Sequence, residues 1–424
     1  MKFIHAADVH LDSPLRGLER YEGAPVEDLR GATRRAFENL ADLALNEAVD
    51  FVLLAGDLYD GDWKDYNTGL FFSRQMARLR EAGIQVLVIA GNHDAASQIT
   101  RMLRPPENVK IFSTREPETL ILESLGVAVH GQGFATRSVT EDLTRAYPLA
   151  DPDLFNIGLL HTSLDGRPGH EPYAPCGLDG LLSRGYQYWA LGHVHQREIV
   201  AEDPWVVFPG NLQGRHARET GPKGCSLVRV EDGRVGGIDH LSMDVVRWAA
   251  CPVDVTDAAT LDEVYDRVEP VLRAAASHAG NRLLAARLRL IGPCAIHARL
   301  HAKREQVVNA CRALADSVGT GDLWVEKVLI DTQGTLSELP SLARNDAFGG
   351  LLRAIRDLEL QPERLASLLE DVAELGAKLP AELRAGEDAF DPTQTPALQA
   401  CLEDIKSLLL DRLLGQDGDH GETE

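Results

Sequence analysis

The sequence lacks the features of membrane, secreted and disulfide-bonded proteins. No apolar run among its 424 residues approaches the ~18 residues that would span a bilayer. The chain reaches a carboxylate, Asp8, too early for a secretory signal peptide, so we expect none. The six cysteines are scattered without a Cys-x-x-Cys pair, which predicts reduced thiols and neither disulfides nor a zinc knuckle. We therefore expect a cytoplasmic protein that does not bind membranes.

Positive charge is also scarce. The chain has 43 Lys and Arg against 65 Asp and Glu, and its formal net charge is -22. A strongly acidic chain binds nucleic acid poorly, because contacts with phosphates need Lys and Arg. Any contact with DNA must therefore have a local cause. Bound divalent cations would be one, since they are often the largest charges in a site.

Hydrophobic patterning over residues 1–250 predicts an α/β domain. Helical patterns at residues 33–48 and 70–81 separate short apolar stretches that are typical of strands buried on both faces. The expected strands cover residues 2–7, 51–55, 85–90, 127–130, 155–160, 188–191 and 205–208.

The pattern changes after residue 250. Residues 251–335 predict a compact β-α-β-α-β unit, with strands near residues 253–255, 284–290 and 323–330 and helices at 261–276 and 296–315. Residues 336–424 show helical signals only. Asn345 or Asp346 could cap one helix, and Thr395 and Pro396 open another that carries Leu398, Leu402, Ile405 and Leu409. The sequence thus predicts three regions.

Five of the expected strands end in polar residues that can bind metals. These residues are Asp8 and His10, Asp57, the run Asn92-His93-Asp94, His161, and the pair His193 and His195. Ligands collect at the carboxyl ends of strands in open α/β sheets, so these side chains should converge on one crevice. Glycines at positions 56, 91 and 192 precede three of the motifs and permit a close approach of the backbone to the metals.

The donor set indicates a centre with two metals. Carboxylate and amide oxygens combined with imidazole nitrogens suit Mn, Fe or Zn. About seven ligands are too many for one tetrahedral zinc, and two metals with a shared carboxylate favour in-line attack on phosphorus. Each motif alone has an ordinary alternative, since Gly-Asn-His-Asp is also a turn sequence and His161 alone would be a buried structural histidine. Their joint occurrence, each after an apolar strand, favours the metal centre.

The motifs Asp-x-His, Gly-Asp, Gly-Asn-His-Asp, His and Gly-His-x-His together resemble the signature of the calcineurin-like metallophosphoesterases. The opening residues 3–12 are more similar to the SbcD-like branch, and residues 161–163 and 209–215 to its YhaO-type DNA repair exonucleases. The resemblance covers residues 1 to about 230. It implies a four-layer α/β/β/α metallophosphoesterase sandwich (1–250), a small α/β capping domain (251–335) and a C-terminal helical region (336–424).

The resemblance also implies a role for each motif residue. Two divalent metal ions are expected, with Mn²⁺ as the implied metal, and the first would be held by Asp8, His10, Asp57 and His195. The second would be held by Asp57, Asn92, His161 and His193, so that Asp57 bridges the two. His93 would face the scissile phosphate, where it stabilises the transition state or protonates the leaving oxygen, and Asp94 would orient its ring.

Two further features bear on the substrate. SbcD-like nucleases often carry a second active-site histidine three residues after the bridging aspartate, and this chain has Asp60 there. Arg215 and Arg218 lie in a glycine-rich loop after the last motif and are candidates for binding substrate phosphates. Arg101, Arg104 and Lys110 form a second such group. For each of these residues, a solvated loop charge is the alternative.

These observations lead to one expected function and two alternatives. We expect a two-metal phosphodiesterase that hydrolyses DNA, a repair exonuclease acting with a coiled-coil SMC-like ATPase of the SbcC/YhaN type and as a homodimer. The first alternative is a phosphoesterase for a small nucleotide or a phosphoprotein, on the same site. The second is a scaffold whose C-terminal helices bind a partner, with catalysis secondary.

Overall fold

The computed structural model describes residues 1–13, 23–60, 66–96, 105–166, 173–319, 322–334 and 346–358, with a few single residues between 399 and 413. The chain forms two compact units. The first consists of Met1–Ala250, Ala276–Ala286 and Asp322–Glu326. The second consists of Cys251–Ala275, Arg287–Gly321 and Lys327–Glu424.

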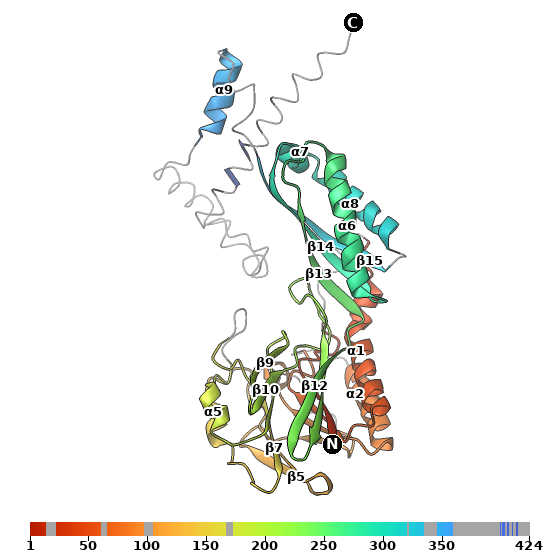
Figure 1. The fold of residues 1–424 in the computed structure, drawn as a ribbon, viewed down its shortest axis with the longest axis vertical. Coiled ribbons are helices and arrows are strands. Elements are labelled where there is room, and N and C mark those ends of the chain that lie inside the picture. Colours follow the sequence, from red (N-terminus) through yellow and green to blue (C-terminus); the bar gives the residue numbers. More distant parts are fainter. Residues whose placement is uncertain are drawn as a thin grey trace. The chain divides into compact units, whose positions relative to one another are not determined.

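Two six-stranded sheets form the first unit (Figure 1). The strands of one sheet follow the order β12 (Arg234–Ser242), β11 (Gly224–Glu231), β1 (Lys2–Ala6), β2 (Phe51–Ala55), β3 (Gln85–Ile89) and β4 (Val109–Ile111). The other has the order β5 (Glu118–Leu122), β6 (Val127–Gly131), β7 (Phe155–His161), β8 (Tyr188–Gly192), β10 (Trp205–Phe208) and β9 (Glu198–Glu202). The strands β1 to β4 are parallel, as are β6, β7, β8 and β10.

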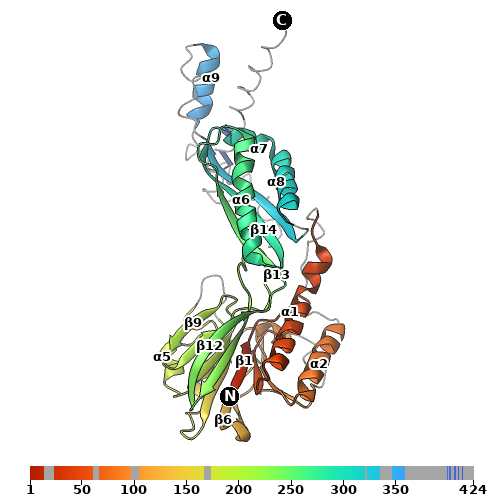
Figure 2. The same cartoon turned by 45° about the vertical axis from the view of Figure 1, so that its right-hand side comes forward.

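Helices cover the outer faces of the two sheets, which confirms the predicted four-layer α/β/β/α sandwich. The helices α1 (Val26–Asn46) and α2 (Tyr66–Glu81) lie side by side on one face, and the short α5 (Leu178–Leu182) lies on the opposite side (Figures 1 and 2). Between the sheets, Phe3 stacks on Phe51 within a fully buried cluster. The parallel strands are therefore buried on both faces, as their continuous apolar sequence predicts.

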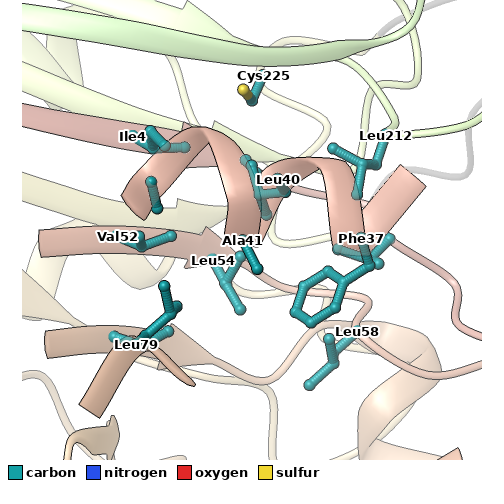
Figure 3. Close-up of a cluster of buried hydrophobic side chains, with 14 of the residues drawn as sticks. Ile4, Phe37, Leu40, Ala41, Val52, Leu54, Leu58, Leu79, Leu212 and Cys225 are labelled. Carbon is teal, nitrogen blue, oxygen red and sulfur yellow. The ribbon is translucent and has the colours of Figure 1, made fainter. Parts of the chain in front are cut away.

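The helix α1 is held to its sheet by one apolar face. Its buried residues recur at intervals of three and four: Leu29, Ala32, Thr33, Ala36, Phe37, Leu40, Ala41 and Ala44. Figure 3 shows Phe37, Leu40 and Ala41 packed over the sheet residues Val52 and Leu54. The helix begins at Val26, earlier than the predicted residue 33, and its buried face extends back to Leu29.

Residues 246–334 follow the predicted β-α-β-α-β order and contribute to both units. Their elements are β13 (Val246–Asp254), α6 (Leu261–Ala279), β14 (Leu283–Cys294), α7 (His297–Ala302), α8 (Arg304–Val318) and β15 (Leu323–Gly334). The single helix predicted over 296–315 is two helices, because the backbone of Lys303 leaves the helical conformation (φ -111°, ψ 31°). The three strands form one sheet in the order β13-β14-β15.

The C-terminal region contributes one helix to the described part of the chain. The helix α9 (Ala347–Arg356) begins where expected, because the Asp346 side chain accepts a hydrogen bond from the Gly349 backbone N–H (2.8 Å). The helix predicted from Thr395 lies largely outside the described residues. Among the helices that the structure describes, none has both the length and the apolarity needed to cross a bilayer.

The strands β11 and β12 were not predicted, although their turn has a clear sequence signal. They form an antiparallel hairpin whose turn residues, Asp232 and Gly233, both have positive φ (48° and 71°). Asp-Gly is a preferred sequence for such a turn. The strand β11 pairs antiparallel with β1 and so extends the first sheet beyond its parallel strands.

We expect Phe37→Ala to destabilise the first unit strongly. The Phe37 ring is 1% exposed and lies 5.8 Å from that of Phe72, so its removal leaves a cavity under α1. The cost should be about 3–5 kcal/mol in the free energy of unfolding, measured by urea denaturation. Leu70→Ala is the matched control in α2, because Leu70 is 54% exposed and its truncation should cost less than about 0.5 kcal/mol. Equal effects of the two variants would contradict this packing.

Candidate metal centre

The carboxyl ends of five strands meet at one edge of the sandwich. The strands β1, β2 and β3 come from the first sheet, and β7 and β8 come from the second. The seven predicted ligands follow or end these strands: Asp8, His10, Asp57, Asn92, His161, His193 and His195. The structure brings all of them into one cluster.

One oxygen of Asp57 lies at the middle of this cluster. Its Oδ2 atom is 3.5 Å from His161 Nε2 and 3.9 Å from His10 Nε2. Its Oδ1 atom accepts a hydrogen bond from the His93 backbone N–H (2.9 Å). His10 and His161 were expected to bind different metals, so the position of Oδ2 between them is the geometry that a bridging carboxylate needs.

Asp8 connects the two halves of the cluster. Its carboxylate accepts a hydrogen bond from the His193 backbone N–H (2.9 Å), and its Oδ1 atom is 3.7 Å from His195 Nε2. Among the described residues, three groups have ligand atoms that all lie within 4.8 Å of one another: Asp8, His10 and His195; Asp8, Asp57 and His161; and His10, Asp60 and His93. Two cation sites that share this edge are therefore sterically possible.

The Nε2 lone pair of His161 faces other hydrogen-bond acceptors. Its Nδ1–H donates to the Ala55 carbonyl (2.9 Å), so in the neutral ring Nε2 has no hydrogen. Nε2 faces Asn92 Oδ1 at 3.0 Å and the carboxylate of Asp57. Burial by itself lowers the pKa of His161, but the charges of Asp57 and Asp8 outweigh burial and raise it to about 9. This position therefore attracts a cation, which is a proton or a metal ion.

His10 gives the second sign that the site fits metal ions. Its side chain is fully buried, and neither ring nitrogen has a hydrogen-bond partner in the part of the chain that the structure describes. Burial and the nearby charge of Arg215 lower its pKa to about 3, so the ring is neutral. A neutral buried imidazole without a hydrogen-bond partner is unfavourable unless it binds a ligand. The residues present thus fit divalent cations.

The backbone at the cluster is held in an unusual conformation. Asp8, His10, Asp57 and His193 all have positive φ, between 48° and 98°. Non-glycine residues rarely adopt this region, and those that do cluster at functional sites. Glycines allow close approaches here, since a Cβ atom at Gly192 would collide with the Ala55 carbonyl oxygen and one at Gly91 would collide with Asp57 Oδ1. The strand ends are therefore shaped to direct these side chains inward.

His93 pairs with Asp60 and not with Asp94, which corrects the role expected for Asp94. The Nδ1–H of His93 donates to Asp60 Oδ1 (2.7 Å). Burial lowers the pKa of His93, but the hydrogen bond to Asp60 and the carboxylate charges raise it overall. Asp94 is fully buried, and it accepts backbone N–H groups of Leu58, Tyr59 and Gly91. It therefore fixes the loops that carry Asp57 and Asn92.

Glu219 is a functional candidate that the sequence did not reveal. Its Oε1 atom accepts a hydrogen bond from His195 Nδ1 (2.6 Å), which leaves His195 Nε2 directed at Asp8. Metal-binding histidines commonly donate their other N–H to a carboxylate in this way. No motif spacing indicates this pairing, because 24 residues of loop and strand separate the two positions.

The predicted substrate-binding residues have different surroundings. Arg215 is 14% exposed and lies beside Glu219, whereas Arg218 is exposed. Lys110 forms an ion pair with Glu118. Lys223, in the same loop region as Arg215, donates a hydrogen bond to the His195 carbonyl (2.8 Å) and so holds the backbone of that metal-ligand motif. Arg101 and Arg104 lie outside the described residues.

Comparisons with known families agree with this geometry. Residues 1–197 match the calcineurin-like phosphoesterases, and residues 248–333 match the middle domain of metallophosphoesterase YhaO. The chain is 40% identical over 273 residues to the uncharacterized metallophosphoesterase YhaO of Bacillus subtilis, which covers 63% of this chain and 67% of YhaO.

More distant similarity extends to repair proteins. The chain is 26% identical to the DNA double-strand break repair protein Mre11 of Sulfurisphaera tokodaii, over 58% of this chain and 63% of that one. It is 27% identical to Mre11 of Methanopyrus kandleri, over 55% of this chain and 51% of that one. A solved dimetal phosphatase from Danio rerio aligns with 57% of this chain and 97% of its own (11% identity, TM-score 0.35). The chain belongs to the calcineurin-like metallophosphoesterases of the YhaO type.

Proposed function

We propose that this metallophosphoesterase is a nuclease that hydrolyses phosphodiester bonds of DNA with two bound divalent metal ions. The observation that carries the proposal is the cluster around Asp57 Oδ2, with the protonatable His93 on its half-exposed side. The similarity to the Mre11 repair proteins supports DNA as the substrate. Manganese is the proposed metal on the basis of the family resemblance, and the mixed oxygen and nitrogen donor set suits Mn, Fe or Zn.

Each side of the cluster would hold one ion. Asp8, His10, Asp57 and His195 would hold the first, and Asp57, Asn92, His161 and His193 would hold the second. When bound, the two ions would supply Lewis-acid activation of the phosphoryl group and of the attacking water. The chain's own contribution is to orient the ligands and to keep them largely out of solvent.

His93 would deliver a proton to the leaving oxygen. Its Nδ1–H is committed to Asp60, so Nε2–H of the imidazolium is the group that can donate. The carboxylate of Asp60 favours the protonated ring, which suits a general acid. The side chain of His93 is 30% exposed, so a substrate can reach it.

A small phosphoester is the second candidate substrate. The charge distribution favours it, because the chain is strongly acidic and both Lys110 and Lys223 are engaged within the protein. A purified full-length chain with Mn²⁺ distinguishes the two candidates. Degradation of end-labelled linear DNA supports the nuclease, whereas intact DNA together with hydrolysis of a small phosphoester supports the alternative.

A coiled-coil ATPase partner and a homodimer also remain proposals, and they rest on the family resemblance. The helix α9 has a buried Leu352 and an exposed Leu351 (47%), so part of its apolar surface is available for a partner. Co-purification of the chain with such an ATPase, with and without residues 346–424, would test the first proposal.

We expect Asp57→Asn to lose bound metal. The substitution keeps the shape of the side chain but removes the charge that both ions would share. Metal analysis of dialysed protein should show about two Mn²⁺ per wild-type chain and clearly less than one in the variant. Asp239→Asn is the control, because Asp239 is exposed and pairs with Arg229, away from the cluster. A variant that retains both ions would contradict the bridging role.

We expect His93→Ala to keep metal and lose DNA hydrolysis. His93 is the group proposed to protonate the leaving oxygen, so kcat should fall by about 10²–10⁴-fold without it. His278→Ala is the control, since His278 is an exposed histidine of α6. The idea fails if the His93 variant digests DNA at the wild-type rate while it carries the full complement of metal.

We expect Arg218→Ala to weaken DNA binding without changing the chemical step. An exposed arginine beside the site would contact a phosphate, so its loss should raise KM and reduce the salt dependence of binding by about one unit of slope. Arg145→Ala is the control, because Arg145 is 84% exposed in a different loop. An unchanged KM and salt slope would show that Arg218 is a solvated charge.

A further inference from the structure

Arg215 lies between two carboxylates, each of which holds a histidine of the site. Its Nη1 atom is 3.8 Å from Asp60 Oδ2, and its Nη2 atom is 3.3 Å from Glu219 Oε1. Asp60 accepts a hydrogen bond from His93 with its other oxygen. Glu219 accepts one from His195. The Arg215 guanidinium therefore lies beside both the carboxylate that holds the expected proton donor, His93, and the carboxylate that holds the metal ligand His195.

The surroundings of Arg215 indicate that its charge is already balanced. Its side chain is 14% exposed, and those of Asp60 and Glu219 are 17% and 6% exposed. A guanidinium in such a position is stable only beside anions, and the two carboxylates supply them. Because they also offset its charge, little net attraction is left for a substrate phosphate. The side chain is thus better suited to hold protein groups than to bind substrate.

The local chain fixes the point from which this side chain extends. Glu219 Oε2 accepts hydrogen bonds from the Arg215 backbone N–H (2.7 Å) and from Asn211 Nδ2 (2.9 Å). Gly214 closes the turn, since a Cβ atom there would lie 2.7 Å from the Glu219 carbonyl oxygen. On the far side, Ser13 Oγ donates to Asp60 Oδ2 (2.6 Å). Both ends of the bridge are therefore anchored by short hydrogen bonds.

We infer that Arg215 is a positioning residue, which acts through Asp60 to aim His93 at the leaving oxygen and through Glu219 to steady His195. This inference replaces the expected role of Arg215 in substrate binding, and it rests on the proposed function of His93. An arginine suits the bridge because its planar fork can reach two carboxylates at once, which the single ammonium of a lysine cannot do in the same way.

The test compares two phosphodiesters whose leaving groups differ in basicity. Nitrophenolate leaves bis(4-nitrophenyl) phosphate without needing a proton, whereas the alkoxide of a DNA strand must be protonated. With Mn²⁺-loaded full-length protein, Arg215→Ala should lower kcat on a short oligonucleotide by about 10²-fold. On the nitrophenyl ester, kcat should change by less than about 3-fold. Arg145→Ala should match the wild type on both substrates.

Two further measurements separate positioning from other roles. The double variant Asp60→Asn with Arg215→Ala should be no slower than Asp60→Asn alone, because both act through His93. The KM of Arg215→Ala should match that of the wild type. Equal losses of rate on both substrates with a raised KM would overturn the inference in favour of phosphate binding. Losses that multiply in the double variant would also overturn it.

The inference about Arg215 can still be tested if DNA is not the substrate. Wild-type protein that cleaves the nitrophenyl ester but no oligonucleotide would refute the proposed nuclease and leave the inference testable on diphenyl phosphate. Phenolate is more basic than nitrophenolate, so the Arg215 variant should then lose more rate on the phenyl ester. A loss that is the same for both esters would refute the inference on its own.

Discussion

The site depends on one electrostatic constraint. Several hydrogen-bond acceptors lie close together and buried from water, with too few donor hydrogens to pair them. Asp57, Asp8, Asn92 and the lone pair of His161 face one another within a few ångströms. His10 adds a buried neutral ring without a hydrogen-bond partner among the described residues. Such a group is unfavourable by itself, and divalent cations relieve the repulsion. The chemistry of these donors therefore favours the binding of divalent cations.

The large buried core of the sandwich holds the strained backbone of the ligands in place. The ligands lie on strand ends with positive φ, a conformation that persists only where the surrounding structure enforces it. The strands behind them are almost completely buried between the two sheets and under α1 and α2. Asp94 then fixes two of the loops through three backbone hydrogen bonds. The rigidity of the site is therefore a property of the whole first unit.

A second set of charged groups orients the histidines of the site. Asp60 and Glu219 each hold one histidine, so the orientations of His93 and His195 are set by carboxylates outside the metal cluster. The aspartate at position 60 stands where SbcD-like nucleases often have a histidine. Its observed partner, His93, gives that departure a physical meaning, because the carboxylate supports the protonated ring of the neighbouring histidine.

The sequence by itself determined the buried parallel strands and the residues at their ends, because such strands have continuous apolar runs and five of these runs lead directly into a polar motif. The sandwich was expected from the family resemblance. The sequence could not reveal the β11–β12 hairpin's place beside β1, since pairing across more than 200 residues leaves no local pattern. Nor could it assign Asp60 to His93 or Glu219 to His195. Those pairs join loops that only the packing of the two sheets brings together, and a hydrogen bond depends on distances of a few ångströms that spacing along the chain does not encode.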